Sequence, residues 1–183
     1  MIGFLQRRLS VRRALESARP RLYRLAWSWC HDADEANDVV QEACLKAMER
    51  TAQLRDPAKT EQWLVKIMSN VFLDRVRARR EHMDITAMEL EAADDGPLEA
   101  AQRSHAVDQV RAAIAELSVD QRMVLTMVDL QDFSYAEVSE ALDIPVGTVM
   151  SRLCRARRRL KEQLLLQAAI PRSAVAGHLR RVK

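Results

Sequence analysis

The chain has 183 residues, of which 48% are hydrophobic, 4% are aromatic and 30% are charged, with a net charge of +3. This length allows one ordinary domain or two small ones and leaves no room for a large catalytic scaffold. The apolar content excludes an intrinsically disordered chain, and the scarcity of aromatic residues and glycine predicts an all-α protein. Residues 1–10 lack the apolar core of a signal peptide, and no apolar run reaches about 18 residues, so we expect a cytoplasmic protein without a membrane span.

The first unit of the chain is predicted as a series of amphipathic helices. Leu5 and Leu9 indicate a first helix, and Pro20 predicts a break before a second helix that ends near Trp29. The acids between Asp32 and Asp38 suit the positive end of the helix that follows them. That helix has an apolar stripe formed by Val39, Val40, Ala43, Ala47 and Met48.

A longer helix is expected over about residues 61–80, after a connection at residues 52–60. On this helix Trp63, Lys66, Asn70 and Arg77 fall within a sector about 60° wide. Cations, an amide and an aromatic ring are what a single-stranded nucleic acid needs for its phosphates, a base edge and stacking. Core packing is the simpler interpretation of Trp63, whereas Asn70 is a poor helix former in mid-helix and needs another reason.

The charges along the chain are segregated into blocks. Residues 1–25 carry seven arginines and one glutamate, and residues 32–43 carry five acids and no base. Residues 81–101 carry seven acids and no Lys or Arg, whereas residues 152–161 carry six cations and no acid. One basic block is usually only a solvated helix face, but two on separate helical units, with the helix-turn-helix pattern described below, indicate phosphate binding.

The acidic stretch marks a domain boundary. It contains Gly96 and Pro97 and has no sustained apolar periodicity, which predicts a flexible linker. We therefore expect two small helical domains at residues 1–80 and 103–166, an acidic linker at residues 81–102 and a basic tail, for which we favour disorder, at residues 167–183.

The second unit has the order of a helix-turn-helix. Ser118 is expected to cap a helix at residues 119–128, and Ser134 with Glu137 forms a capping box that opens a short helix. A compact turn at residues 143–147 then leads into a long final helix.

The final helix is apolar on one side and cationic on the other. Its apolar stripe comprises Val149, Leu153, Ala156, Leu160 and Leu164. Its far side carries Ser151, Arg152, Arg155, Arg158 and Arg159. We expect residues 148–155 to reach base edges and Arg158 and Arg159 to reach phosphates. A solvated surface helix would explain the stripe, but not the six cations without an acid between Arg152 and Lys161.

The sequence offers little for metal binding or catalysis. Its three cysteines, Cys30, Cys44 and Cys154, are far apart and form no CxxC pair, so we expect buried thiols rather than disulfides or a metal site. It has no glycine-rich phosphate loop, HExxH or GxSxG motif. We therefore expect neither an enzyme nor a cofactor.

Five segments together resemble the extracytoplasmic-function (ECF) class of bacterial RNA polymerase sigma factors. They are residues 38–43 (DVVQEA), 63–70 (WLVKIMSN), 74–77 (DRVR), 134–138 (SYAEV) and 145–157 (PVGTVMSRLCRAR). They occur in the family's order over residues 10–165, with the family's linker length, and residues 145–153 are similar to its general-stress subgroup.

The resemblance implies a role for each unit. The first would be sigma region 2, which binds core polymerase through Asp38, Val39, Gln41 and Glu42. It would capture a flipped base of the melted −10 element with the residues Leu54, Trp63, Lys66, Asn70 and Arg77. The second would be region 4, which reads the −35 element with Thr148, Met150, Ser151, Arg152, Cys154 and Arg155, and reaches phosphates with Arg158 and Arg159. The acidic linker would enter cationic channels of the polymerase.

The resemblance also implies a partner and leaves alternatives open. ECF proteins are typically held inactive by an anti-sigma factor, which we therefore expect here. Departures from the family pattern at residues 54–59 and at Met150 leave the promoter bases undefined. The alternatives are a sigma-like decoy that sequesters an anti-sigma factor and an ordinary helix-turn-helix repressor.

Overall fold

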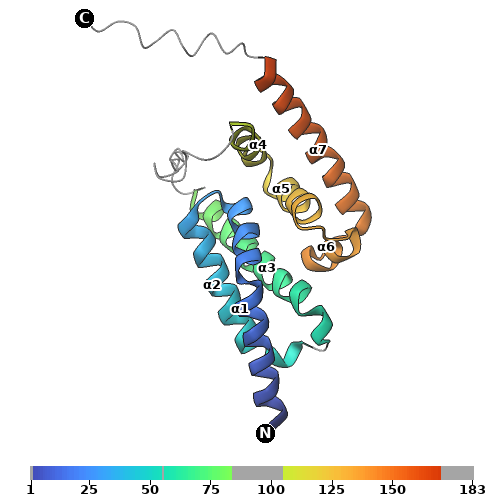
Figure 1. Ribbon diagram of the computed structural model, residues 1–183. Helices are drawn as coiled ribbons and strands as arrows, with labels where there is room; N and C mark the ends of the chain where they lie inside the picture. The colour runs from blue at the N-terminus through green and yellow to red at the C-terminus, as the bar shows by residue number, and fades with distance from the viewer. Residues whose placement is uncertain (1, 55, 84–104, 170–183) are drawn as a thin grey trace, which may run out of the picture.

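The computed structural model describes residues 2–54, 56–83 and 105–169 (Figure 1). Within these ranges the regular elements are helices and there is no strand, which confirms the all-α prediction. In chain order they are α1 (Ile2–Cys30), α2 (Ala33–Glu49), η1 (Thr51–Gln53), η2 (Pro57–Lys59), α3 (Thr60–Met83), α4 (His105–Ala115), α5 (Val119–Leu125), η4 (Thr126–Leu130), α6 (Tyr135–Leu142) and α7 (Val146–Ala169). Residues 84–102 of the predicted linker and residues 170–183 of the predicted tail lie outside the described residues, whereas residues 81–83 form the end of α3.

Helix α1 is continuous, so the break predicted at Pro20 is wrong. Pro20 removes one backbone hydrogen bond, but it lies on the exposed side of the helix, where water can serve the carbonyl that is left. Val11 and Leu15 before the proline and Leu22 and Leu25 after it are all buried. Tertiary packing on both sides of Pro20 therefore holds the helix together.

Helices α1, α2 and α3 pack into the first unit. Asp32 is the N-cap of α2, and its Oδ1 accepts a hydrogen bond of 2.7 Å from the backbone N–H of Glu35. This confirms the predicted helix start at the acidic cluster, because Asp34 and Glu35 lie in the first turn of α2. The predicted stripe of α2 faces the core, since Val39, Val40, Ala43 and Ala47 are buried.

Helices α4 to α7 form the second unit. Ser118 is the N-cap of α5 as predicted, but its side chain makes no capping bond. Helix α5 continues into η4, a single π-helical turn. Ser134 and Glu137 form the predicted capping box at the start of α6, with both side chains bonded to the other residue's backbone.

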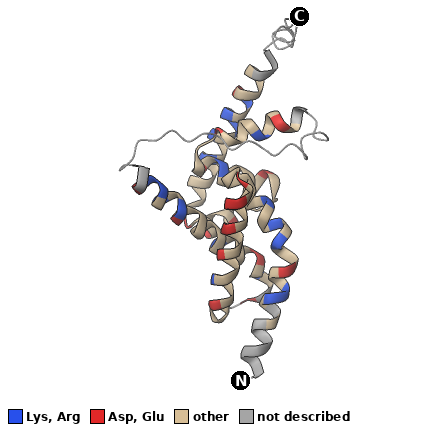
Figure 2. Cartoon of the chain, turned by 90° about the vertical axis from the view of Figure 1, so that its left-hand side faces the viewer, with Lys and Arg blue, Asp and Glu red and all other residues tan. Residues whose placement is uncertain are grey.

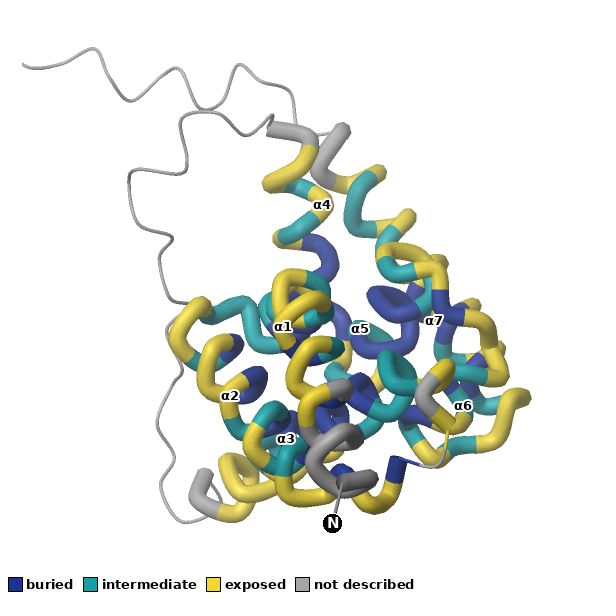
Figure 3. The backbone as a smooth tube through the Cα atoms, turned by 60° about the horizontal axis from the view of Figure 1, so that its bottom comes forward, coloured by how far each residue is buried: buried dark blue, intermediate teal, exposed yellow. Residues whose placement is uncertain are grey.

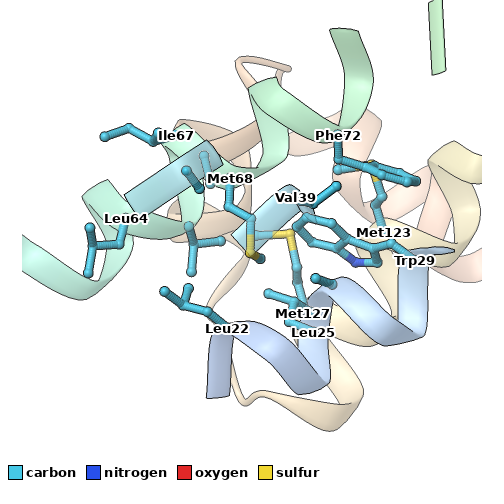
Figure 4. Packing of buried hydrophobic residues seen from close by; sticks show 14 of the residues in the cluster. Leu22, Leu25, Trp29, Val39, Leu64, Ile67, Met68, Phe72, Met123 and Met127 are labelled. Carbon is cyan, nitrogen blue, oxygen red and sulfur yellow. The ribbon is translucent and has the colours of Figure 1, made fainter. Parts of the chain in front are cut away.

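The two units share one hydrophobic core. Trp29 of α1 is 1% exposed, and its ring lies 5.4 Å from that of Phe72 in α3. Met123 and Met127, from the second unit, are also buried and pack in the same cluster (Figure 4). Figure 3 shows the buried stretch of α5 at the centre of the molecule, between α1 and α7. The units, which were expected as separate domains, therefore pack against each other.

Candidate nucleic-acid interface

The turn between α6 and α7 fixes the direction of the recognition helix. Asp143 ends α6 in the left-handed conformation, with φ 53° and ψ 47°. Ser139 Oγ donates a hydrogen bond of 2.6 Å to the carbonyl of Ile144, and the carbonyl of Pro145 accepts from the N–H of Thr148 at 2.8 Å. These bonds satisfy the backbone of the turn, so that α7 leaves α6 at a defined angle.

Helix α7 buries one side and exposes the other. Val149, Leu153 and Ala156 are at most 2% exposed and pack against α5 and α6. The exposed side carries Met150, Ser151, Cys154, Arg155, Arg158 and Arg159. Basic residues follow one another along this helix, which leads to the C-terminus (Figure 2). The geometry suits a helix that enters a DNA groove with one side held by its own domain.

Three guanidinium groups of α7 gather in one surface pocket. Arg155, Arg158 and Arg159 line a pocket of about 450 Å³. Its other lining residues are Gln121, Glu162, Gln163 and Leu166. Arg155 is also ordered locally, because its Nε donates to the carbonyl of Ser151 at 3.2 Å. The pocket therefore offers three positive charges to a phosphate backbone, and the sequence pattern had not indicated Gln121.

The cationic side of α7 is less uniform than the sequence implied. Arg152 lies 2.8 Å from Asp120 of α5, and Arg157 lies 2.6 Å from Asp129 of η4. The hydrogen bond to Asp129 is the main cause that raises the pKa of Arg157. Thr148 is half-buried. Among the residues predicted to read −35 bases, Arg152 is therefore held by a carboxylate from its own domain.

A second pocket lies at the residues predicted to bind the −10 strand. It has a volume of about 310 Å³, and Leu54, Trp63 and Lys66 line it together. Gln53, Asp56, Lys59 and Gln62 from the first unit, and Glu137, Glu140 and Ala141 from α6, complete its lining. Asn70 and Arg77 are exposed further along α3 and are not among the lining residues. Trp63 is half-buried and also packs on the core.

The predicted polymerase-binding residues of α2 do not all reach the surface. Asp38 and Gln41 are exposed, and Glu42 is half-exposed. Glu42 is paired with Lys46 at 2.8 Å and with Arg75 at 3.0 Å, and the bond to Lys46 is the first cause that lowers its pKa. Val39 is 0% exposed, which corrects the prediction that it contacts polymerase: the apolar stripe of α2 places it in the core.

Other kinds of site find little support in the part of the chain that the structure describes. There, no three His, Cys, Asp or Glu side chains are placed to hold a metal ion. No helix among those residues is both long and apolar enough to cross a bilayer. Cys154 is exposed on α7, whereas Cys30 and Cys44 are half-buried. The prediction of three buried thiols is therefore wrong for Cys154, because its position on α7 falls outside the apolar stripe.

The three thiols are expected to react at different rates. Burial, reinforced by Glu35, raises the pKa of Cys30 from 9.0 to about 12, and burial also raises that of Cys44. A thiol whose pKa rises by three units has about a thousandfold less thiolate at any pH well below both values. We expect iodoacetamide at pH 8 to alkylate Cys154 first and Cys30 last, as followed by peptide mass spectrometry. Equal rates before denaturation would contradict the described burial, and equal rates in urea are the control.

Comparisons with known proteins agree with this architecture. Residues 14–82 match the family "Sigma-70 region 2", and residues 108–160 match "Sigma-70, region 4". The chain belongs to the sigma-70 family of RNA polymerase sigma factors. Its relatives place it in the ECF class, as the sequence predicted, and the general-stress subgroup stays a prediction.

The similarity to these relatives extends over most of the chain. The chain is 32% identical to the ECF sigma factor SigE of Mycolicibacterium smegmatis, in an alignment that covers 79% of this chain and 57% of that protein. It is 32% identical to the ECF sigma factor EcfG of Rhodopseudomonas palustris over 87% of this chain and 88% of that protein. Its fold matches the sigma factor RpoE of Bartonella quintana, solved with the anti-sigma factor NepR, at a TM-score of 0.73. That match has 30% identity and covers 84% of this chain and 95% of the other.

Proposed function

We propose that this chain binds core RNA polymerase, directs it to promoters with −35 and −10 elements and helps to open the duplex. The observation that carries the proposal is the exposed side of α7, which carries several guanidinium groups. The opposite side of α7 is buried in its own unit, and most of the helix lies within the segment that matches region 4. Because the DNA template and RNA polymerase of a bacterium are in the cytoplasm, this activity would take place there.

Recognition of the −35 element would divide between bases and backbone. Met150, Ser151, Cys154 and Arg155 lie on the exposed side of the first half of α7, where a recognition helix reaches base edges. Arg158 and Arg159 follow in the next turn and would bind phosphates. Because Arg152 already has a carboxylate partner, its contribution to DNA binding would require Asp120 to release it or share it.

Opening at the −10 element would use the strip on α3. Trp63 offers a ring, Lys66 a charge and Asn70 an amide, all on one side of the helix. A base that leaves the stack costs a few kcal/mol, and a stacking contact returns about 1–3 kcal/mol per base. Strand capture of this kind therefore offsets much of the cost of melting without ATP.

Control by an anti-sigma factor is part of the proposal. The Bartonella quintana RpoE structure contains such a partner, NepR, and its sigma chain shares the fold of this one. Leu165 and Leu166 of α7 are 60% and 69% exposed, and Leu160, Leu164 and Leu165 line an apolar surface pocket. Exposed leucines of this kind suit a protein partner. Purification of the tagged chain from its native cells should return polymerase and a specific inhibitor; polymerase alone would contradict this part.

Transcription with purified components tests the central proposal. Core polymerase supplied with the chain should initiate on a promoter library at sites that share two sequence elements, and core polymerase alone should not. A sigma-like decoy would give no initiation. A repressor would protect duplex DNA from nuclease without polymerase, so footprinting of the chain alone separates that alternative.

A further inference from the structure

The start of helix α7 carries apolar side chains on its exposed side. Val146 and Met150 are 42% and 52% exposed, and Cys154 is exposed as well. These residues follow one another at intervals of four, so their side chains lie on neighbouring turns of one side of the helix. We call them the apolar strip, which is separate from the buried stripe that joins α7 to its own unit.

The chain leaves the space beside the apolar strip open. A Cβ atom at Gly147 would meet no atom within 4 Å other than those of its chain neighbours and its own helix backbone. Figure 3 shows α7 at the edge of the molecule, with exposed residues along its outer side. Single apolar residues on a surface are ordinary, but these three are contiguous and lie where a recognition helix meets DNA. The apolar strip is therefore available to a partner.

The cations beside the apolar strip indicate which kind of partner fits it. Arg158 follows Cys154 by four residues and lies about 40° further around the helix. Arg155 and Arg158 belong to the cluster of three guanidinium groups on α7. An apolar protein surface would bury these charges without partners, whereas a DNA groove offers phosphates to the cations and base edges to the strip. The charges therefore favour duplex DNA as the occupant.

Apolar side chains recognise one particular feature of the major groove. Among the four bases only thymine presents a methyl group there. An amino group or a ring nitrogen placed against a methionine would lose its hydrogen bond to water and gain no other. From Val146 to Cys154 the helix rises about 12 Å, which is the length of about three base-pair steps. The apolar strip is therefore long enough to contact more than one thymine.

We propose that the apolar strip reads thymine: Met150 and Cys154 cover thymine methyl groups in the −35 element. This inference rests on the proposed function and deepens it, because it names a base that the sequence pattern left undefined. The arginines of the same helix are suited to guanine and to phosphates, so apolar and cationic residues divide the element between them.

Replacement of thymine by deoxyuridine tests the inference, because it removes the methyl group and keeps every hydrogen-bonding group of the base. The full chain with core polymerase first selects its −35 sequence from a promoter library. Each thymine of either strand of that element is then replaced in turn, and competition between duplexes measures the affinity of the holoenzyme. We expect at least one replacement to weaken binding about fourfold, which corresponds to one buried methyl group.

A methyl group on a different base provides an independent measurement. At the sensitive position, 5-methylcytosine should bind more tightly than cytosine, again by about fourfold, because the two bases differ only in the methyl group. Equal affinity for thymine and deoxyuridine at every position overturns the inference. A selected −35 element that contains no thymine on either strand overturns it as well.

Met150→Gln connects the methyl effect to its side chain. Glutamine is similar in length but polar, and position 150 is exposed, so the substitution is compatible with the helix. This variant should bind thymine and deoxyuridine about equally at one position, whereas Met150→Leu should keep the preference. Cys154→Ser should remove the preference at a neighbouring position in the same way. A preference that survives in both Met150→Gln and Cys154→Ser contradicts the assignment.

Leu130→Gln is the matched control. Leu130 is 53% exposed in η4 of the same unit, so its substitution makes a similar change of surface polarity away from the apolar strip. The control should keep the full preference for thymine, and circular dichroism checks that all variants fold. A control that loses the preference would overturn the inference, because the effect would then not depend on the apolar strip.

The remaining outcomes separate this inference from the proposed function. If core polymerase with the unmodified chain initiates at no shared sequence, the proposed function fails and the inference fails with it. If initiation is sequence-specific and every thymine tolerates deoxyuridine, the inference alone fails. If Met150→Gln weakens assembly with core polymerase and leaves the thymine preference intact, the apolar strip is a protein contact, which also overturns the inference.

Discussion

Trp29→Ala is expected to lower the free energy of unfolding by about 3–5 kcal/mol. Trp29 is 1% exposed, packs against Phe72 and donates its indole N–H to Thr126. The substitution opens a cavity in the core that the two units share and leaves the hydroxyl of Thr126 without this donor. Urea unfolding followed by circular dichroism measures the change. Since domains of this size are stable by about 5–15 kcal/mol, the variant loses a large part of its stability.

Trp27→Ala is the matched control for this prediction. It deletes the same side chain two residues earlier on α1, where the indole is half-buried and packs beside His31 and under the guanidinium of Arg111. The loss should be clearly smaller, because less apolar surface returns to water. Equal costs for the two substitutions would mean that Trp29 does not occupy the centre of the core.

Arg155→Ala is expected to weaken promoter binding by about 1–3 kcal/mol, or about 5- to 150-fold, and to change the preferred −35 sequence. Arg155 is exposed on the first half of α7, and its guanidinium is ordered by Ser151. A guanidinium in this position can bond two acceptors of a base edge at once, whereas alanine offers no donor. Selection from a promoter library by the reconstituted holoenzyme measures both affinity and sequence preference.

The control here is Arg158→Ala, one turn further from the start of α7. Arg158 lines the same pocket and is assigned to phosphates, so its loss should weaken binding about equally for all −35 sequences and reduce the dependence on salt. Unchanged selectivity in Arg155→Ala would contradict the assignment of Arg155 to base readout.

Local features of the fold could be predicted from the sequence because their causes are local. Asp32 and Ser134 start helices through bonds to backbone groups three residues away. The stripes of α2 and α7 follow from helical periodicity and are buried over most of their length, whereas Met48, Leu160 and Leu164 at their C-terminal ends are half-buried. The break predicted at Pro20 does not occur, because packing on both sides of the residue outweighs the local effect of the proline.

The arrangement of the site depended on contacts between distant residues, which a pattern cannot reveal. Arg152 and Asp120 are 32 positions apart, and their pairing removes one of the six cations of α7 from the free surface. Val39 belongs to a motif whose polar residues, Asp38 and Gln41, are exposed to solvent. Its own side chain falls on the apolar stripe of α2 and is buried in the core. The covering of α3 by α6 brings Ser69 to Ala141 across 72 positions.

The shared core has a consequence for how substitutions in this chain would behave. Met123 and Met127 fill the second unit and also help to hold it against the first. Replacing either by a smaller residue would weaken the protein against heat and proteolysis and, by the same loss of contact, loosen the second unit from the first. A substitution at either position should therefore lower the stability of both units at once, so that they unfold together rather than one after the other.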